Sequence, residues 1–249
     1  MKLVEKNQFS SFRMVGAYAI GFATLLSFPY LQKMVGGSDF FNGFSYAVAG
    51  YMFEYCLHGN VTIEGLIINY TVFMAFGEVT CMIFGGLSPV FTKTVGSKRM
   101  AFFWSALLCL VLSIAFFFIP MSPDYIWVMI ALVILTSIGI GIYSPLMWSM
   151  YADVADYHTE HFGTSATGLI FSSGTMSQKF GTAISGSLIA LFLGWAGANM
   201  ITDKMGNTVI DPTSITDSVL MMVWSLFSLF PAAIAFLLMV LSYKFPIKK

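Results

Sequence analysis

Charged residues are scarce in this chain. Asp, Glu, Lys and Arg make up 10% of its 249 residues, whereas 57% of the residues are hydrophobic. A soluble domain carries roughly 25% charged residues, so this composition excludes an ordinary soluble protein. The mean hydropathy is +0.81, and several apolar runs reach the ~20 residues that a helix needs to cross a bilayer. We therefore expect an integral membrane protein in the plasma (inner) membrane.

Three further absences narrow the function. The net charge is zero, so nothing indicates nucleic acid or an acidic partner. Cys56, Cys81 and Cys109 lie in apolar surroundings without paired spacing, which predicts neither a disulfide framework nor a zinc site. No small-x-small cleavage site closes the first apolar run, so we expect no cleavable signal peptide.

The apolar runs predict one all-α domain over residues 1–249, a six-transmembrane-helix bundle. Helices are expected because lipid offers no partner for open backbone groups. The predicted spans cover approximately residues 9–30, 63–87, 101–120, 125–150, 167–195 and 219–243.

The stretch 40–57 is semi-apolar, and the sequence leaves three alternatives for it: an extension of the first helix, an interfacial segment or a seventh span. With six spans, nine of the twelve basic residues share one side of the membrane, namely Lys2, Lys6, Arg13, Lys93, Lys98, Arg99, Lys244, Lys248 and Lys249. The positive-inside rule then predicts that both termini are cytoplasmic. A full extra crossing would move the amino terminus outside, so six spans are favoured.

Lys179 lies about a dozen residues inside the predicted span 167–195. An ammonium group at the centre of a membrane helix costs at least ~2.5 kcal/mol, so such a residue usually marks a pathway, a ligand site or a buried partner. It shares a helical stripe with hydroxyl groups and a glycine, as expected for the wall of a cavity; the stripe contains Ser172, Thr175, Lys179, Thr182 and Gly186. A second row, Ser177, Gly181 and Ser185, predicts close helix packing.

Glu78 lies in the middle of the predicted span 63–87. It is interpreted either as part of a proton or cation relay, or as a buried ion-pair partner of Lys179. Pro145 and Trp148 lie near the inner end of the span 125–150. The indole could stack on a sugar ring while donating from its N–H, although a tryptophan at this depth is commonly an interfacial belt residue.

A short polar stretch follows, with carboxylates and imidazoles that could suggest a metal site; it contains Asp153, Asp156, His158, Glu160 and His161. No cysteine or third histidine supports that hypothesis. We expect a solvated cytoplasmic turn with no metal and no cofactor.

The run PLMWSMYADVADY (145–157), followed by Glu160, Gly163, Gly168-Leu169 and Ser177-Gln178-Lys179-Phe180-Gly181, resembles the late signature of the glycoside–pentoside–hexuronide:cation symporters. These are sugar transporters of the major facilitator superfamily. The resemblance implies that the chain is the carboxyl-terminal six-helix half of such a transporter. It also implies that Lys179 lines a sugar and cation cavity, with Trp148 as a sugar contact. From the helical stripe and the intramembrane carboxylate, we expect Ser172, Thr175, Thr182 and Glu78 to line the same cavity. A cytoplasmic gate would contain Asp153, Asp156, Tyr157, Glu160, Gly163 and Gly168.

The chain departs from the family pattern in two places. Ser165 stands where the family usually has an arginine, and the region around Gly36 fits an insertion. The family's acidic cation site belongs to an amino-terminal half that has no counterpart here. We therefore expect the chain to pair with a missing half or with a second copy. The other expected partners are a sugar or glycoside, Na⁺ or H⁺, and the bilayer. A truncated non-functional fragment and a membrane-embedded metal-dependent enzyme stay open as alternatives.

Overall fold

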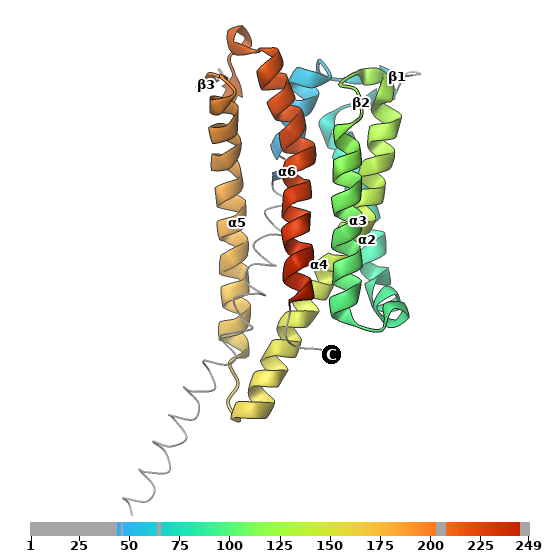
Figure 1. Cartoon of the computed structure of the whole chain (residues 1–249), viewed down its shortest axis with the longest axis vertical. Coiled ribbons are helices and arrows are strands. Elements are labelled where there is room, and N and C mark those ends of the chain that lie inside the picture. Colours follow the sequence, from blue (N-terminus) through green and yellow to red (C-terminus); the bar gives the residue numbers. More distant parts are fainter. Residues whose placement is uncertain (1–43, 46, 64–65, 203–207, 245–249) are drawn as a thin grey trace, which may run out of the picture.

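A computed structural model describes residues 44–45, 47–63, 66–202 and 208–244. This part of the chain is mostly helical (Figure 1), and its long helices are α2 (Tyr70–Val95), α3 (Lys98–Phe117), α4 (Ile126–Phe162), α5 (Thr167–Trp195) and α6 (Asp217–Tyr243). Shorter elements are the π-helical η1 (Met52–Cys56), the 3-10 turns η2 (Pro123–Tyr125) and η3 (Pro212–Ser214), and the strands β1 (Val61–Ile63), β2 (Leu66–Ile68), β3 (Met200–Thr202) and β4 (Thr208–Ile210).

Four helical runs of the described residues are long and apolar enough to cross a membrane: Tyr70–Val95, Lys98–Phe117, Pro123–His161 and Asp217–Tyr243. The chain is therefore an integral membrane protein. Helix α5 is long enough but is not among the four, because Lys179 and its many hydroxyl and glycine residues reduce its apolar character. The predicted span 9–30 lies outside the described residues, and the six-helix count stays a prediction.

The amino-terminal part of the predicted span 63–87 is not helical. Strands β1 and β2 form an antiparallel hairpin in which Val61 pairs with Ile68, and β3 pairs with β4 in a second hairpin. Helix α2 begins only after Asn69, whose side chain accepts a hydrogen bond from the Val72 backbone N–H at 2.9 Å. Such a cap fixes the start of a helix more sharply than apolar content does. The all-α expectation therefore holds for the long elements but missed both hairpins.

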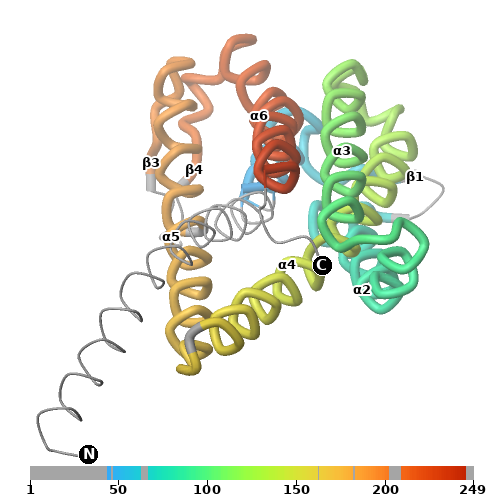
Figure 2. Tube along the Cα trace, turned by 60° about the horizontal axis from the view of Figure 1, so that its bottom comes forward, coloured from blue at the N-terminus to red at the C-terminus, as the bar shows by residue number. Residues whose placement is uncertain are grey.

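The polar stretch 153–161 was predicted as a turn, and this prediction was wrong. The stretch forms the last part of α4, which ends only at Gly163 in a left-handed conformation with φ 65°. Neither glycine nor proline occurs between Pro145 and Gly163, so nothing interrupts the helix before that point. In Figure 2 this end of α4 runs away from α2 and α3 toward the start of α5.

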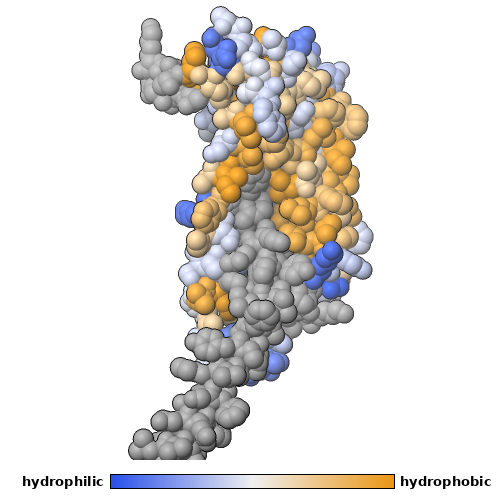
Figure 3. Space-filling view, turned by 60° about the vertical axis from the view of Figure 1, so that its left-hand side comes forward, coloured by the Kyte–Doolittle hydropathy of each residue, from blue (hydrophilic) through white to orange (hydrophobic). Residues whose placement is uncertain are grey.

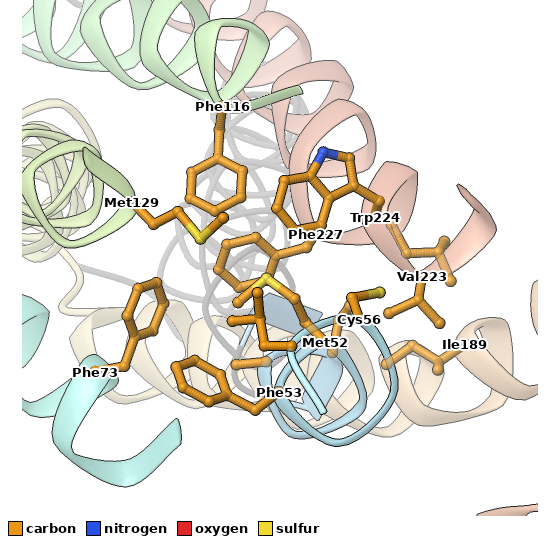
Figure 4. Packing of buried hydrophobic residues seen from close by; sticks show 14 of the residues in the cluster. Met52, Phe53, Cys56, Phe73, Phe116, Met129, Ile189, Val223, Trp224 and Phe227 are labelled. Atoms are coloured by element: carbon orange, nitrogen blue, oxygen red, sulfur yellow. The ribbon is translucent and has the colours of Figure 1, made fainter. Parts of the chain in front are cut away.

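Most of the described residues in 44–45 and 47–57 pack inside the molecule. Phe44 and Met52 are fully buried, and Figure 4 shows Met52 and Phe53 meeting aromatic side chains of α2, α3 and α6. The hydroxyl of Tyr55 accepts a hydrogen bond from the backbone N–H of Ile210 in β4 at 2.9 Å. The segment is thereby tied to the hairpin end of the molecule, and it is not one of the span-length helices of the described residues.

Glycines let the central helices approach closely. A Cβ at Gly141 of α4 would lie 2.8 Å from the backbone oxygen of Cys81 in α2, and one at Gly139 would lie 2.8 Å from that of Ser105 in α3. Small residues at helix interfaces are a common means of association in membranes. Helix α4 therefore packs between α2 and α3, whereas α5 has fewer contacts and touches mainly α4 and α6.

The connections between the helices lie at two ends of the molecule. Both hairpins lie at one end, and the α2–α3 and α4–α5 connections lie at the other together with the end of α6 (Figure 1). The described basic residues of the positive-inside set, Lys93, Lys98, Arg99 and Lys244, thus share this second end. In Figure 3 hydrophobic side chains gather between the two ends, as a bilayer-facing surface requires.

Candidate substrate cavity

A cavity of about 530 Å³ lies between α2 and α4 and extends to α3 and α6. Its volume is within the usual range for small-molecule sites. The described lining is largely apolar, but it includes hydroxyl side chains from three segments: Ser45, Ser113, Thr136, Ser137 and Ser144. Three aromatic side chains, Phe116, Trp148 and Phe227, complete the set of groups that could hold a polar ring.

Glu78 is the one charged side chain among the described lining residues. It follows Gly77, where an added Cβ would lie 2.8 Å from the hydroxyl oxygen of Ser137. This close approach of α2 to α4 places the carboxylate and the α4 hydroxyl groups along the same cavity. Glu78 is exposed, and its neighbour in the lining, Met82, is 75% exposed, so the cavity is open on the α2 side.

Trp148 lines the cavity from α4. Its ring is parallel to that of Phe171 in α5, at 7° with centroids 6.2 Å apart, and it is tilted against Tyr151 at 5.7 Å. Pro145, also in the lining, lies less than one turn earlier in α4. Neighbouring rings thus hold the indole at the cavity. An interfacial belt residue would not need such contacts.

The α5 stripe lies on a different helix from the cavity residues. Lys179, Ser172 and Thr175 are exposed and are not in the described lining. The Ser172 hydroxyl donates to the Leu169 carbonyl at 3.0 Å, and the Thr175 hydroxyl donates to the Ser172 carbonyl at 2.8 Å. Thr182 belongs to the same helix by its backbone. The structure therefore brings Glu78 and Trp148 together, and it does not group the α5 residues with them.

Glu78 and Lys179 do not form an ion pair in the described part of the chain, where the salt bridge present joins Lys98 and Asp153. The expected row of small residues on α5 does lie on its packed side, because Gly181 and Ser185 are buried. Helix α5 also approaches α4 closely at Gly174, where an added Cβ would lie 2.8 Å from the ring of Tyr151.

The predicted gate residues lie around the α4–α5 connection. Asp153 is half-buried against Lys98, while Asp156 and Glu160 are exposed. Tyr157 stacks on His161 with ring centroids 3.9 Å apart. Gly163 ends α4, and Gly168 lies exposed in the first turn of α5. The residues are gathered at one end of the molecule, at the connection that a gate would use.

The two histidines of this region are engaged with backbone carbonyls. Nδ1 of His158 lies 2.9 Å from the Thr164 oxygen, and Nδ1 of His161 lies 3.0 Å from the Tyr157 oxygen. Among the residues that the structure describes, no three His, Cys, Asp or Glu side chains come together in a way that would hold a metal ion.

Sequence reasoning missed most of the α4 wall of the cavity. Its lining residues recur at helical spacing, as Val133, Thr136, Ser137, Ile140, Gly141, Ser144, Pro145 and Trp148. Intervals of three and four residues define one face of a helix. The same pattern was recognised on α5, where a lysine drew attention to it, and applying it to α4 would have found Thr136, Ser137 and Ser144.

The comparisons with known proteins agree with this architecture. The family model described as MFS/sugar transport protein matches residues 39–249. An uncharacterized 29.9 kDa protein in the crtE 3' region of Pseudescherichia vulneris is 39% identical over 101 residues, which are 41% of this chain and 36% of that protein. Two proteins of Escherichia coli strain K12 also match, the putative glycoside/cation symporter YagG and the inner membrane symporter YicJ.

YagG is 29% identical over 46% of this chain and 26% of its own length, and YicJ is 30% identical over 51% of this chain and 27% of its own length. The aligned regions thus span about a quarter to a third of these curated relatives. The family match covers most of the chain and includes every residue of the cavity and the gate. The chain therefore belongs to the MFS/sugar transport protein family, and its resemblance to the glycoside–pentoside–hexuronide:cation symporters is confirmed.

Proposed function

We propose that this chain is part of a secondary active transporter, not an enzyme, that takes up a sugar or glycoside together with Na⁺ or H⁺. The observation that carries the proposal is the cavity between α2 and α4, which combines a carboxylate, several hydroxyl groups and an indole. Family membership and the names of the relatives, two of which are called symporters, support the same function.

The cavity has the groups that sugar binding requires. Glu78, Ser137 and Ser144 can accept hydrogen bonds from sugar hydroxyls, and the indole of Trp148 offers an apolar ring with a polar edge. Carboxylates within membrane helices also commonly take part in cation or proton pathways. Glu78 is thus the residue of this chain that we assign to both ligands.

We further assign Lys179, Ser172, Thr175 and Thr182 of α5 to a second wall of the same vestibule. Ser172, Thr175 and Lys179 are exposed on a helix that touches α4 and α6. In alternating access, two helix bundles rock about a site that both of them line. The second bundle would be another six-helix unit or a second copy of this chain, meeting α5 and the open side of the cavity.

The gate residues Asp153, Asp156, Tyr157, Glu160, Gly163 and Gly168 would then lie on the cytoplasmic side of the inner membrane, with both termini. The basic residues at this end of the described helices, Lys93, Lys98, Arg99 and Lys244, support that orientation. Opening and closing would change the packing between α4 and α5, which touch each other less extensively than α4 touches α2 or α3.

Uptake of labelled disaccharides, with and without Na⁺, tests the proposal in cells that produce the chain together with its neighbouring genes. Trp148→Ala and Lys179→Ala should each reduce uptake at least about tenfold, the effect of losing ~1.4 kcal/mol of binding. Trp127→Ala is the matched control, because Trp127 is 50% exposed and remote from the described cavity lining. Normal uptake by the Trp148 and Lys179 variants would contradict the site assignment, and absence of uptake for every sugar would contradict the function.

A further inference from the structure

Three aromatic rings meet where α4 and α5 are in contact. Trp148 and Tyr151 come from α4, and Phe171 comes from α5. The ring centroids lie 5.7 Å apart for Trp148 and Tyr151, 6.2 Å apart for Trp148 and Phe171, and 6.1 Å apart for Tyr151 and Phe171. All three separations fall within the range of favourable aromatic contact. Each ring therefore restricts the orientation of the other two.

Of these three rings, only that of Trp148 belongs to the described lining of the cavity. The Trp148 side chain is half-buried, and its ring plane makes an angle of 7° with that of Phe171. A sugar can stack on an indole only when the face of the indole is turned toward the sugar, so the orientation of this ring matters for binding. Phe171 thus contacts the residue that we assign to the sugar, although Phe171 itself is not in the described lining.

Gly174 holds α5 against the same three rings. It lies three residues after Phe171, on the same face of α5, and a Cβ added there would lie 2.8 Å from the ring of Tyr151. Tyr151 is itself fully buried. The backbone of α5 therefore lies directly on the Tyr151 ring, and this close approach fixes the position from which Phe171 reaches Trp148.

We infer that Phe171 is a positioning residue of the sugar site, which holds the indole of Trp148 in the orientation that a bound sugar meets. The inference rests on the proposed function and deepens it, because it gives α5 a role at the cavity although α5 contributes no residue to the described lining. Helix α5 follows directly on the connection that carries the proposed gate. A movement of α5 away from α4 would remove the stacking partner of Trp148, so the affinity for sugar would fall as this packing opens.

Fluorine NMR of the full chain in lipid nanodiscs tests the contact itself. The chain contains five tryptophans, which are labelled as 5-fluorotryptophan, and the Trp148 resonance is the one that Trp148→Phe removes. Phe171→Leu keeps an apolar side chain but removes the ring and its magnetic effect. We therefore expect this variant to shift the Trp148 resonance by more than its linewidth, whereas Phe171→Tyr, which keeps the ring, should leave it close to the wild-type position.

Phe192→Leu is the matched control on the same helix. The ring of Phe192 lies 5.3 Å from that of Trp195, and Phe192 is outside the described lining. This control should shift the Trp195 resonance and leave the Trp148 resonance in place. A Trp148 resonance that Phe171→Leu does not move would overturn the inference. If Phe171→Leu does not fold, Phe171→Met removes the ring with a more flexible side chain and carries the same expectation.

Uptake kinetics test the consequence for sugar binding, in cells that produce the chain together with its neighbouring genes and with a labelled disaccharide that they take up. Phe171→Leu should raise the KM about threefold to tenfold, as expected for the loss of one aromatic contact. The maximal rate should change less than about twofold, because binding is affected and not the later steps. Phe171→Tyr should restore the wild-type KM, and Phe192→Leu should leave it unchanged.

A double-mutant cycle separates positioning from simple packing. In a Trp148→Ala chain, Phe171→Leu should raise the KM no further, because the effect of Phe171 passes through the indole. An equal rise of the KM with and without Trp148 would overturn the inference. A normal KM in Phe171→Leu would also overturn it, and would leave the proposed function intact. If wild-type cells take up none of the labelled disaccharides, the proposed function fails, and the role of Phe171 at a sugar site fails with it.

Discussion

The ammonium group of Lys98 lies 2.7 Å from the Oδ2 atom of Asp153. This ion pair joins the first residue of α3 to the polar end of α4, two segments separated by 55 positions in the sequence. Asp153 belongs to the motif that resembles the symporter family, and Lys98 follows the α2–α3 connection. The pair thus ties the α2–α3 connection to the helix that carries the proposed gate.

Breaking this pair should destabilise the chain only modestly. The side chains of Lys98 and Asp153 are 29% and 17% exposed, so we expect Lys98→Ala to lower the free energy of unfolding by about 1 kcal/mol. The loss should shrink at high salt because ions screen the interaction. Thermal unfolding in detergent measures it, and the charge exchange Lys98→Asp with Asp153→Lys should recover part of the stability. A double exchange no better than either single variant would show that the pair does not stabilise the fold.

Cys81 provides a direct probe of the cavity. It lines the cavity, whereas Cys109 is fully buried and Cys56 is 5% exposed. A small thiol reagent should therefore modify Cys81 first, and a bound sugar should slow that reaction severalfold by covering the thiol. Mass spectrometry of the labelled chain identifies the residue, and Cys81→Ser is the control. Labelling of Cys81 that a bound ligand does not change would place the ligand elsewhere.

Gly141 should tolerate no side chain. An added methyl group would meet the backbone oxygen of Cys81 at 2.8 Å and its Cα at 3.0 Å, and backbone atoms cannot move aside as a flexible side chain can. We expect Gly141→Ala to destabilise the chain by about 1–3 kcal/mol, as overpacking commonly does. Gly86→Ala is the matched control on α2, because nothing lies within 4 Å of its added Cβ. Thermal unfolding of the two variants should differ clearly, and equal stability would contradict the close packing of α2 on α4.

Trp224 connects α6 to the end of α3. Its Nε1 donates a hydrogen bond to the backbone oxygen of Phe117 at 3.2 Å, and its side chain is buried. Trp224→Phe keeps an aromatic ring but leaves this carbonyl without its donor, which should cost about 1–3 kcal/mol of stability. Trp127→Phe, at an exposed position, should change little. Unfolding monitored by circular dichroism compares the two, and similar midpoints would show that the hydrogen bond adds nothing.

Sequence reasoning located the long helices better than it located their ends. Apolar content identifies a span, but Asn69 and Gly163 decide where α2 begins and where α4 ends, through a side-chain cap and a left-handed residue. The polar stretch before Gly163 has the composition of a turn, and its helical structure is therefore not evident from its charges alone. Charged residues at the end of a helix that leaves the bilayer are equally compatible with continued helix.

For the candidate site, too, the sequence identified individual residues but not how they are arranged. Glu78 and Trp148 were selected one at a time, as an unusual charge and an unusual aromatic residue in apolar runs. Neither residue indicated that the two share a cavity, because one lies on α2 and the other on α4. Lys179, the residue on which the predicted cavity was centred, is equally unusual in an apolar run. It nevertheless lies on α5, which contributes no residue to the described lining.

The sequence by itself determined that this chain is an integral membrane protein, that its spans are helical, and that it resembles a family of sugar transporters. Composition and a local motif suffice for these conclusions, because the bilayer imposes helix on any apolar run and the motif is contiguous. Only the tertiary structure decided which polar groups meet. That outcome depends on how closely two helices approach, and here the approach is set by glycines such as Gly77 and Gly141, whose missing side chains let distant segments come into contact.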